Sequence, residues 1–290
     1  MSPPDRWLHL RIRVPSDDLR PLVAEGLVAL GGSAVQEEGD VVSTHLPPPE
    51  GGDVDRILRQ ARQLAREVMP GPAAEVEADW VPDEDWARLW KRGIEPRRMT
   101  DRIVVRPTWA EHEPEPGDVV LVIDPQMAFG TGEHATTRGC LRLLDDALRP
   151  GDRVLDVGSG SGILAIAAAR LGAFEVIAVE ADADANLNAR ENLALNGVDG
   201  QVQLTEGFAD AELIARLGTF DLVLANILSS VIRPLLPAFR TALRPGGRLI
   251  VSGILQEESG DVLADAGEAG FRAMAVDEEG EWWSALLEPV

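Results

Sequence analysis

A glycine-rich turn between an apolar strand and an apolar helix is the strongest candidate site in this sequence. Gly158, Gly160 and Gly162 alternate with single residues in this turn. Glycine allows a ligand to approach the main chain closely, because any Cβ would intrude there. A second apolar strand ends at Glu180, and a carboxylate at such a strand tip accepts hydrogen bonds from ribose hydroxyls. The pattern therefore predicts a binding site for a ligand that contains a ribose.

The spacing of the glycines distinguishes between nucleotide cofactors. A dinucleotide fingerprint has the pattern G-x-G-x-x-G, whereas the third glycine here comes at Gly162 and gives G-x-G-x-G. The chain has no Gly-Lys-[Ser/Thr] of a phosphate-binding loop and no G-x-S-x-G nucleophile elbow. With Glu180 as the acid at the second strand tip, the pattern points to S-adenosylmethionine.

Two longer segments resemble a known family. Residues 124–137 read D-P-Q-M-A-F-G-T-G-E-H-A-T-T, and residues 221–228 read D-L-V-L-A-N-I-L. The first is similar to the A-F-G-T-G-x-H-x-T-T signature of the PrmA family of ribosomal protein methyltransferases, and the second is similar to its V-A-N-I-L element. Further matches are residues 251–255, residues 280–282 and a connector with Trp86 and Trp90. The resemblance spans nearly the whole chain.

The resemblance implies a fold, a cofactor and a substrate. The family belongs to the class I methyltransferases, which use S-adenosylmethionine on a seven-stranded α/β domain. Its members methylate amino groups, lysine side chains and the N-terminal α-amine, of the eleventh large-subunit ribosomal protein. The matching positions imply cofactor contacts at Thr137, Gly158, Gly160, Glu180 and Asn226. Many relatives have Asp where this chain has Glu180, which retains the carboxylate and changes its reach.

Several side chains near these motifs have two interpretations. Asn226 follows a buried strand and can both donate and accept hydrogen bonds to a ligand, or it can cap the next helix. Phe129 can cover the cofactor or the target amine, or serve as a packing anchor. His134 can act as a general base or simply open the helix at 135–148. Trp282 and Trp283 are expected in the last strand, where core packing is the preferred interpretation and a position of one of them at the site is the alternative. The sequence identifies no catalytic residue.

The predicted elements from residue 118 onward alternate as in a doubly wound α/β sheet. Ligands bind at the carboxyl ends of the strands in such sheets, where Gly158, Glu180 and Asn226 would lie. Strands are expected at 119–123, 153–157, 174–179, 201–205, 221–225, 247–252, 271–276 and 281–287. Helices are expected between them, at about 135–148, 162–171, 183–195, 209–216, 230–243 and 256–268.

A small α+β unit is predicted to precede this domain. Strands at 7–14, 34–36, 41–46 and 74–80 and helices at 19–30 and 54–68 give the order β-α-β-β-α-β. This order is the ferredoxin-like arrangement. We expect a substrate-recognition domain at 1–80, a connector at 81–116 and the methyltransferase domain at 117–290. In the connector, Trp86 and Trp90 share one face of a short helix and are expected to pack against a neighbouring domain.

The composition restricts the class of function further. The chain has 27 Lys+Arg against 49 Asp+Glu, a formal net charge of −22, which argues against a nucleic-acid binder and suits a basic protein substrate. Cys140 is the single cysteine among four scattered histidines, so a Cys/His metal cluster is not expected. No apolar run approaches the length of a membrane span. We expect a cytoplasmic enzyme without a metal, and no pattern fixes its oligomeric state.

Two alternatives to the family's function are open, and two further classes fit less well. A methyltransferase of the same fold could act on another protein or on a small molecule. A non-catalytic module could retain the fold and bind the cofactor only. A nicotinamide dehydrogenase fits least, because of the glycine spacing. A nucleic-acid methyltransferase is disfavoured, since Asn226 is followed by Ile227 and Leu228 and lacks the Pro and aromatic residue that stack a flipped base.

Overall fold

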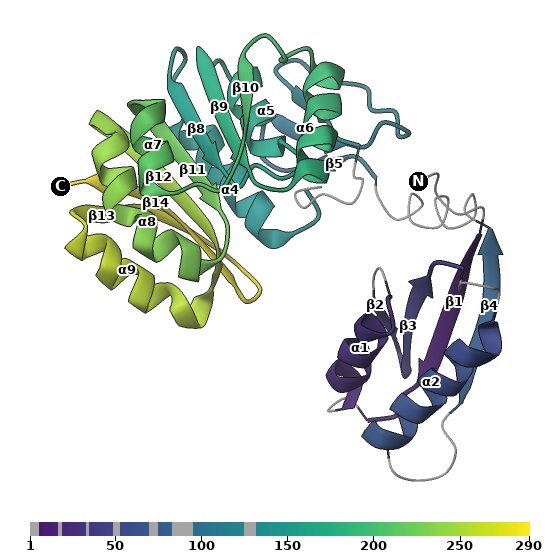
Figure 1. Ribbon diagram of the computed structural model, residues 1–290. Helices are drawn as coiled ribbons and strands as arrows, with labels where there is room; N and C mark the ends of the chain where they lie inside the picture. The colour runs from purple at the N-terminus through teal and green to yellow at the C-terminus, as the bar shows by residue number, and fades with distance from the viewer. Residues whose placement is uncertain are drawn as a thin grey trace. The chain divides into compact units, whose positions relative to one another are not determined.

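The computed structural model describes residues 6–16, 19–32, 35–48, 53–69, 75–82, 95–124 and 132–290. The chain divides into two compact units, Met1–Gly93 and Ile94–Val290 (Figure 1). Each unit has a sheet and a hydrophobic core of its own. Among the described residues, no helix is both long and apolar enough to cross a membrane.

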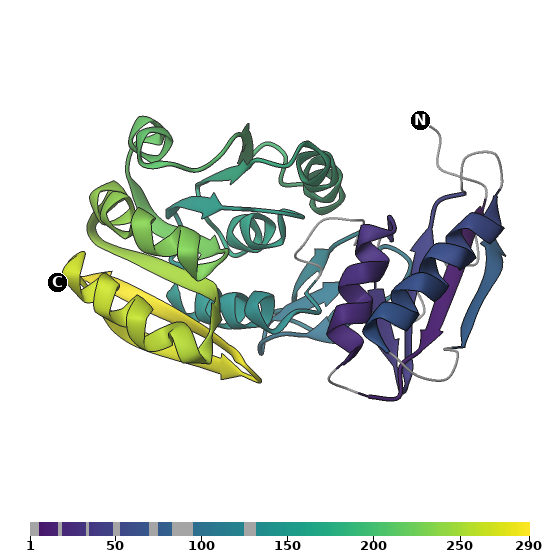
Figure 2. The same ribbon diagram turned by 60° about the horizontal axis from the view of Figure 1, so that its bottom comes forward.

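The N-terminal unit is a four-stranded antiparallel sheet with two helices on one face (Figure 2). Its strand order is β2-β3-β1-β4. Leu8, Leu10 and Ile12 are buried at every second position of β1, against the helices, as the period of a strand requires. The predicted order β-α-β-β-α-β is observed. The elements are β1 (Arg6–Arg13), α1 (Arg20–Ala29), β2 (Val35–Glu38), β3 (Val41–Leu46), α2 (Val54–Val68) and β4 (Val76–Pro82).

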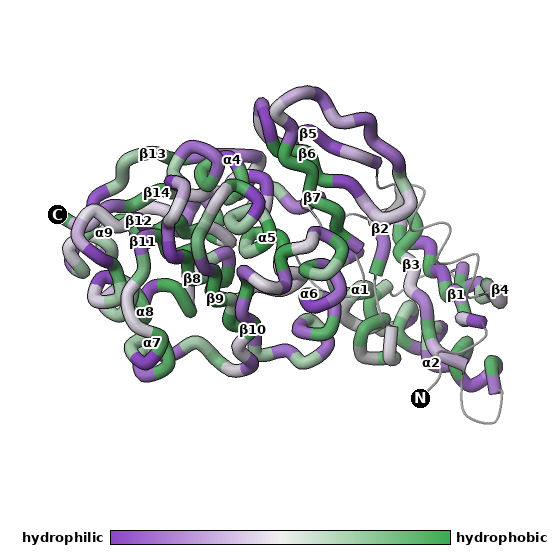
Figure 3. Tube along the Cα trace, turned by 90° about the horizontal axis from the view of Figure 1, so that it is seen from above, coloured by the Kyte–Doolittle hydropathy of each residue, from purple (hydrophilic) through white to green (hydrophobic). Residues whose placement is uncertain are grey.

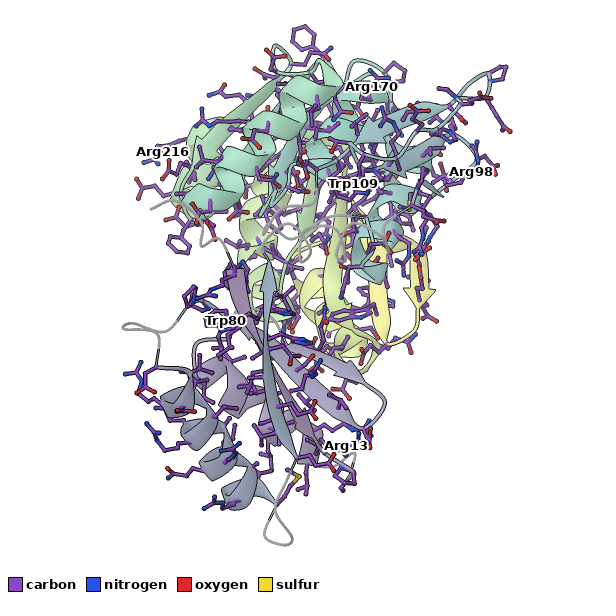
Figure 4. The ribbon with its side chains drawn as sticks, turned by 90° about the vertical axis from the view of Figure 1, so that its right-hand side faces the viewer. Arg13, Trp80, Arg98, Trp109, Arg170 and Arg216 are labelled. Carbon is purple, nitrogen blue, oxygen red and sulfur yellow. The ribbon has the colours of Figure 1, made fainter. Side chains whose placement is uncertain are left out.

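The other face of this sheet carries ion pairs. Arg13 donates hydrogen bonds to Asp40 at 2.6 Å and to Glu75 at 2.8 Å (Figure 4). Arg11 likewise pairs with Glu77 at 3.2 Å. These guanidinium groups are matched by carboxylates of the same unit, so this face does not present the excess positive charge that phosphate binding needs.

The C-terminal unit is built on a seven-stranded sheet in the order β10-β9-β8-β11-β12-β14-β13. The first five strands in this order are parallel, and β14 is antiparallel to both of its neighbours. The strands are β8 (Arg153–Val157), β9 (Glu175–Glu180), β10 (Val202–Glu206), β11 (Phe220–Asn226), β12 (Leu243–Leu255), β13 (Phe271–Glu279) and β14 (Trp282–Pro289). The predicted class I arrangement is thus confirmed.

Helices cover both faces of this sheet and enclose two cores (Figure 1). Leu222 and Leu224 on β11 face the core with α4, α5 and α6, whereas Val223 and Ala225 face the core with α7, α8 and α9. Both sets are fully buried, as expected for parallel strands between two helical layers. The helices are α4 (Ala135–Ala147), α5 (Ile163–Arg170), α6 (Ala183–Asn196), α7 (Ala211–Leu217), α8 (Ser229–Ala242) and α9 (Ser259–Glu268), the last preceded by a 3-10 turn, η3 (Gln256–Glu258).

One predicted strand lies outside the large sheet. β7 (Val119–Val122) is parallel to β6 (Ile103–Arg106), which is antiparallel to β5 (Arg97–Arg98), in a separate three-stranded sheet. The sequence did not predict β5 and β6, because both are short. Figure 3 shows the hydrophobic residues of β6 and β7, which enter the core on the α5 and α6 side. Arg98 of β5 (Figure 4) donates to Asp118, the residue before β7, at 2.7 Å. This hydrogen bond joins the two outer strands of the small sheet.

The contact of α4 with β14 can be tested by adding a methyl group. At Gly139, inside α4, a Cβ would meet the Ser284 Oγ at 2.5 Å and the Asp277 Oδ1 at 3.0 Å. Gly139→Ala should therefore lower the free energy of unfolding by roughly 1–3 kcal/mol through overpacking, despite the better helix propensity of Ala. Gly260 in α9 has no atom within 4 Å of such a Cβ, so Gly260→Ala is the matched control and should not destabilise. Urea denaturation measures both, and equal stabilities would refute the close packing of α4.

Candidate functional site

A cavity of about 520 Å³ lies at the carboxyl ends of the parallel strands. Its walls come from the segments that follow β8, β9, β10 and β11, from the start of α4 and from β14. Gly158, Gly160, Glu180 and Asn226 all line it, so the structure brings four of the five predicted cofactor residues together. Thr137 is fully buried beside this wall. The size is within the range of small-molecule sites.

The glycine turn is needed for packing as well as for ligand access. Gly158 and Gly160 have φ values of +71° and +53°, a region that other L residues rarely adopt. A Cβ on Gly158 would lie 2.3 Å from the Ile227 Cγ2. At this position the glycine therefore makes room for Ile227, and through it for the segment after β11.

Glu180 holds the glycine turn and its own strand tip together. Its Oε2 accepts a hydrogen bond from the Gly160 amide at 2.9 Å. Its Oε1 accepts from the amides of Ala181 at 2.8 Å and Asp182 at 3.0 Å. A carboxylate has about four lone-pair sites, so acceptor capacity remains on the side that lines the cavity. Asp182 caps α6 by accepting hydrogen bonds from the amides of Asp184 and Ala185.

Asn226 lines the cavity and holds an unsatisfied buried acceptor. Its Nδ2 lies 3.5 Å from the Thr137 Oγ1, and its Oδ1 is buried without a hydrogen-bond partner among the described residues. The cap position of α8 is Leu228, with no side-chain cap, so the helix-capping interpretation of Asn226 is wrong. A buried acceptor that is left unpaired costs free energy, and a donor on a ligand would remove that cost.

His134 opens α4 at the cavity wall. It is the N-cap, and its Nδ1 accepts from the Thr136 amide at 3.4 Å and lies 2.7 Å from the Thr136 Oγ1. Burial, and then the charge of Arg138, lower the pKa of the imidazole. Its ring meets the edge of Trp282 at 4.7 Å between centroids. Trp283 is buried in the core, whereas Trp282 lines the cavity, so the preferred interpretation holds for Trp283 and the alternative holds for Trp282.

Ion pairs fix α4 to the antiparallel edge of the sheet. Arg142 donates to the Asp277 Oδ2 at 2.7 Å and to the Glu279 Oε2 at 2.7 Å. Arg138 donates to both carboxylate oxygens of Glu279, at 2.9 and 3.2 Å through its Nε. The hydrogen bonds from Arg138 hold the pKa of Glu279 at about 2. These ion pairs fix the position of α4, and with it the position of His134 at the cavity wall.

A row of buried asparagine side chains on α6 forms hydrogen bonds with the backbone of β7 and of Asp124. Asn188, Asn192 and Asn196 recur every four residues and are at most 6% exposed. The Asn196 Oδ1 accepts from the Val122 amide at 2.9 Å, and its Nδ2 donates to the Val122 carbonyl at 2.7 Å. Asn192 accepts from the Asp124 amide at 2.8 Å, and Asn188 donates to the Asp124 carbonyl at 3.1 Å. The row fixes the backbone at the start of the 124–137 motif.

Asn192 also reaches the glycine turn. Its Nδ2 donates to the Ser161 carbonyl at 3.0 Å. One carboxamide therefore joins the glycine turn to Asp124. Sequence reasoning missed this row, although polar residues at the positions where a buried helix face needs apolar ones were the available signal.

Asp156 is a second group that sequence reasoning missed. It is fully buried beneath the glycine turn, with its Oδ2 accepting from the Ala165 amide at 3.1 Å. Its Oδ1 is buried without a partner among the described residues. Burial raises the pKa of this carboxyl to about 7, and the charge of Glu180 adds to the effect. Cys140 is fully buried, and burial raises the pKa of its thiol to about 12.

Some predicted features fall outside the described residues. These are Phe129, most of the first half of the 124–137 motif, and the Trp86 and Trp90 connector. Within the described ranges, no group of three or more His, Cys, Asp or Glu residues could hold a metal ion.

Comparison with known proteins gives consistent matches. The family described as "Ribosomal protein L11 methyltransferase (PrmA)" matches residues 48–288. The protein named Ribosomal protein L11 methyltransferase in Pelotomaculum thermopropionicum is 41% identical, over 95% of this chain and 96% of that protein. The protein of the same name in Geobacter sulfurreducens is 40% identical, over 96% of each. A crystal structure of ribosomal protein L11 methylase from Lactobacillus delbrueckii has a TM-score of 0.62 and 30% identity, over 67% of this chain and 98% of that one.

The raised pKa of Asp156 predicts a pH-dependent stability. Between the ordinary value of 3.8 and about 7, the folded chain binds a proton on Asp156 that the unfolded chain does not. Stability should therefore fall as pH rises through this range, by up to about 1.4 kcal/mol per pH unit from this group. Asp156→Asn removes this loss, so its unfolding free energy relative to the parent chain should increase between pH 5 and pH 7 and level off above pH 8. Urea denaturation at each pH measures this difference, and a difference independent of pH would contradict the assignment.

Proposed function

Because the chain belongs to the PrmA family of ribosomal protein L11 methyltransferases, we propose that it transfers methyl groups from S-adenosylmethionine to amino groups of ribosomal protein L11. The acceptors are lysine side chains and the N-terminal α-amine. The observation that carries the proposal is one cavity at adjacent strand tips, lined by the glycine turn, Glu180 and Asn226.

The residues of the cavity fit the cofactor. Glu180 has acceptor capacity for ribose hydroxyls after its three backbone hydrogen bonds. The backbone of Gly158 and Gly160 lines the same space and would lie along the methionine part. Asn226, with Thr137 behind it, would lie near the methyl donor. The lining is largely apolar, as suits the adenine ring.

The chemistry requires alignment more than a reactive side chain. The cofactor supplies a methyl group already activated on a sulfonium, so no metal or covalent nucleophile is needed. The chain's own residues bind both reactants, orient them and exclude water. Asn226 can orient the acceptor, because its unpaired Oδ1 would accept an N–H of the amine and direct the nitrogen lone pair elsewhere, toward the methyl group.

The acceptor amine must be neutral when it reacts. Burial at the cavity and a nearby positive charge both lower the pKa of an amine, so water can be the final proton acceptor. The environment of His134 favours its neutral form, while its Nδ1 is engaged with Thr136. We therefore assign His134 to capping α4 and shaping the cavity, and we assign no side chain as general base.

The substrate proposal has support from charge. A net charge of −22 favours encounter with a basic ribosomal protein in the cytoplasm. We propose that residues 1–80 recognise this substrate and that residues 117–290 bind the cofactor. Removal of residues 1–80 would then abolish methylation of the protein while S-adenosylhomocysteine still binds.

Methyl transfer to ribosomal protein L11 tests the proposed function. The purified chain, with labelled S-adenosylmethionine, should add mass to unmethylated L11 in steps of one methylene. Asn226→Ala should lower kcat at least roughly tenfold, because the amine loses its orienting acceptor. Asn226→Asp keeps an acceptor oxygen and should retain more activity than the Ala variant.

The control for this test is affinity for S-adenosylhomocysteine, measured by calorimetry on the same preparations. Binding of S-adenosylhomocysteine without any methyl transfer to L11 would support the assigned cofactor and contradict the assignment of L11 as substrate. Full turnover by Asn226→Ala would reject the role of Asn226.

The asparagine row gives a second prediction. Asn192→Leu removes the link between the Ser161 carbonyl and the Asp124 amide and should weaken S-adenosylhomocysteine binding roughly five- to tenfold, as for one or two hydrogen bonds. Asn196→Leu is matched in helix, residue type and burial. The Asn196 side chain bonds the Val122 backbone on β7 and the Asn192 carbonyl of its own helix, and none of its hydrogen bonds reaches the glycine turn. It should lower stability and leave the dissociation constant within about twofold. Equal affinities of the two variants would show that the row is structural only.

A further inference from the structure

Exposed apolar side chains surround the cavity next to Asn226. Leu228 is 68% exposed and Val231 is 43% exposed. Both line the cavity, and Trp282 lines it from β14. Apolar side chains that are exposed next to one another at a cavity are a feature of binding surfaces. We call Leu228, Val231 and Trp282 the apolar mouth.

Carboxylates border the apolar mouth on the η3 side. The Gln256 amide donates to the Glu281 carbonyl at 2.8 Å, which joins η3 to the turn that precedes Trp282. Glu257 and Glu281 are both exposed there. The mouth is thus an apolar surface with negative charge at its edge.

Glu258 connects this border to the start of α8. Its Oε1 accepts from the Ser229 hydroxyl at 2.7 Å, and its Oε2 accepts from the Leu255 amide at 3.1 Å. These hydrogen bonds lower the pKa of Glu258, so it is ionised at neutral pH. Arg233 of α8 is paired with Asp265 and its charge also acts on Glu258, so the negative charge of the border comes from Glu257 and Glu281.

We propose that the apolar mouth receives the aliphatic stem of a substrate lysine, and that Glu257 and Glu281 attract the basic segment that carries it. A lysine combines four methylene groups with a terminal amine. The stem would lie on Leu228 and Val231, and the amine would reach the Asn226 Oδ1. This inference rests on the proposed function and names the surface that selects its acceptor.

The chemistry of the mouth favours a lysine over other acceptors. A nucleic-acid substrate would bring phosphates against Glu257, Glu258 and Glu281, which is unfavourable. A small polar metabolite would leave Leu228 and Val231 exposed to water. A lysine stem buries both, and its positive charge before deprotonation matches the border.

Substitution of the mouth tests the proposal with L11 as acceptor. Leu228→Asn should raise the KM for L11 roughly tenfold, the effect of losing one buried leucine contact. Its dissociation constant for S-adenosylhomocysteine should stay within about twofold. Leu263→Asn is the matched control, because Leu263 is 37% exposed on α9 and does not line the cavity. It should leave the KM unchanged.

The charged border is tested in the same assay. Glu257→Gln should raise the KM for L11 about twofold at low salt, and the difference should disappear at high salt as charges are screened. Glu268→Gln, which removes an equally exposed charge at the far end of α9, should leave the KM unchanged.

The outcomes separate this inference from the function on which it rests. If the parent chain binds S-adenosylhomocysteine but does not methylate L11, the proposed function fails. If the parent chain methylates L11 and the Leu228→Asn and Leu263→Asn variants have the same KM for L11, the proposal for the apolar mouth fails while the proposed function stands. A loss of S-adenosylhomocysteine affinity with unchanged KM would also overturn it, because Leu228 would then belong to the cofactor site.

Discussion

The hydrogen bond from the Gly160 amide to the Glu180 carboxylate, 2.9 Å long, is the contact on which the site depends. It joins the tips of β8 and β9, the two strands that carry the glycine turn and the acid. The same carboxylate accepts from the amides of Ala181 and Asp182. A charged acceptor shared by three amides is stronger than neutral pairs. The relative position of turn and acid is therefore set before any ligand binds, as preorganised recognition requires.

Contacts of Asn192 and Ile227 hold the other walls of the cavity in position relative to the glycine turn and Glu180. Asn192 fixes the far end of the glycine turn and Asp124 with one carboxamide. Ile227 packs where a Cβ of Gly158 would be, and its carbonyl lies 2.4 Å from where a Cβ of Gly253 would be. Ile227, the residue that directly follows Asn226 at the end of β11, is thus enclosed between two glycines. Substitution of Gly158 or Gly253 would therefore displace Asn226, whose Oδ1 is the proposed hydrogen-bond acceptor for the substrate amine, without a direct contact to Asn226.

Sequence patterns predicted most of the C-terminal unit because parallel strands between helices are long apolar runs with clear breaks. Gly158, Glu180 and Asn226 were found since each directly follows such a run. β5 and β6 were missed because two to four residues give no period. The asparagine row and Asp156 were missed because their function depends on burial, which local sequence does not report. Trp282 and Trp283 are adjacent, and only the register of β14 determines which of them faces the cavity.

A crystal structure of the chain grown with S-adenosylhomocysteine tests the central claim most directly. The account predicts the ligand in the cavity at the strand tips, with its ribose hydroxyls on Glu180, its amino-acid part along Gly158 and Gly160, and its sulfur toward Asn226. A ligand bound elsewhere on the chain, or bound here with its ribose away from Glu180, would contradict it.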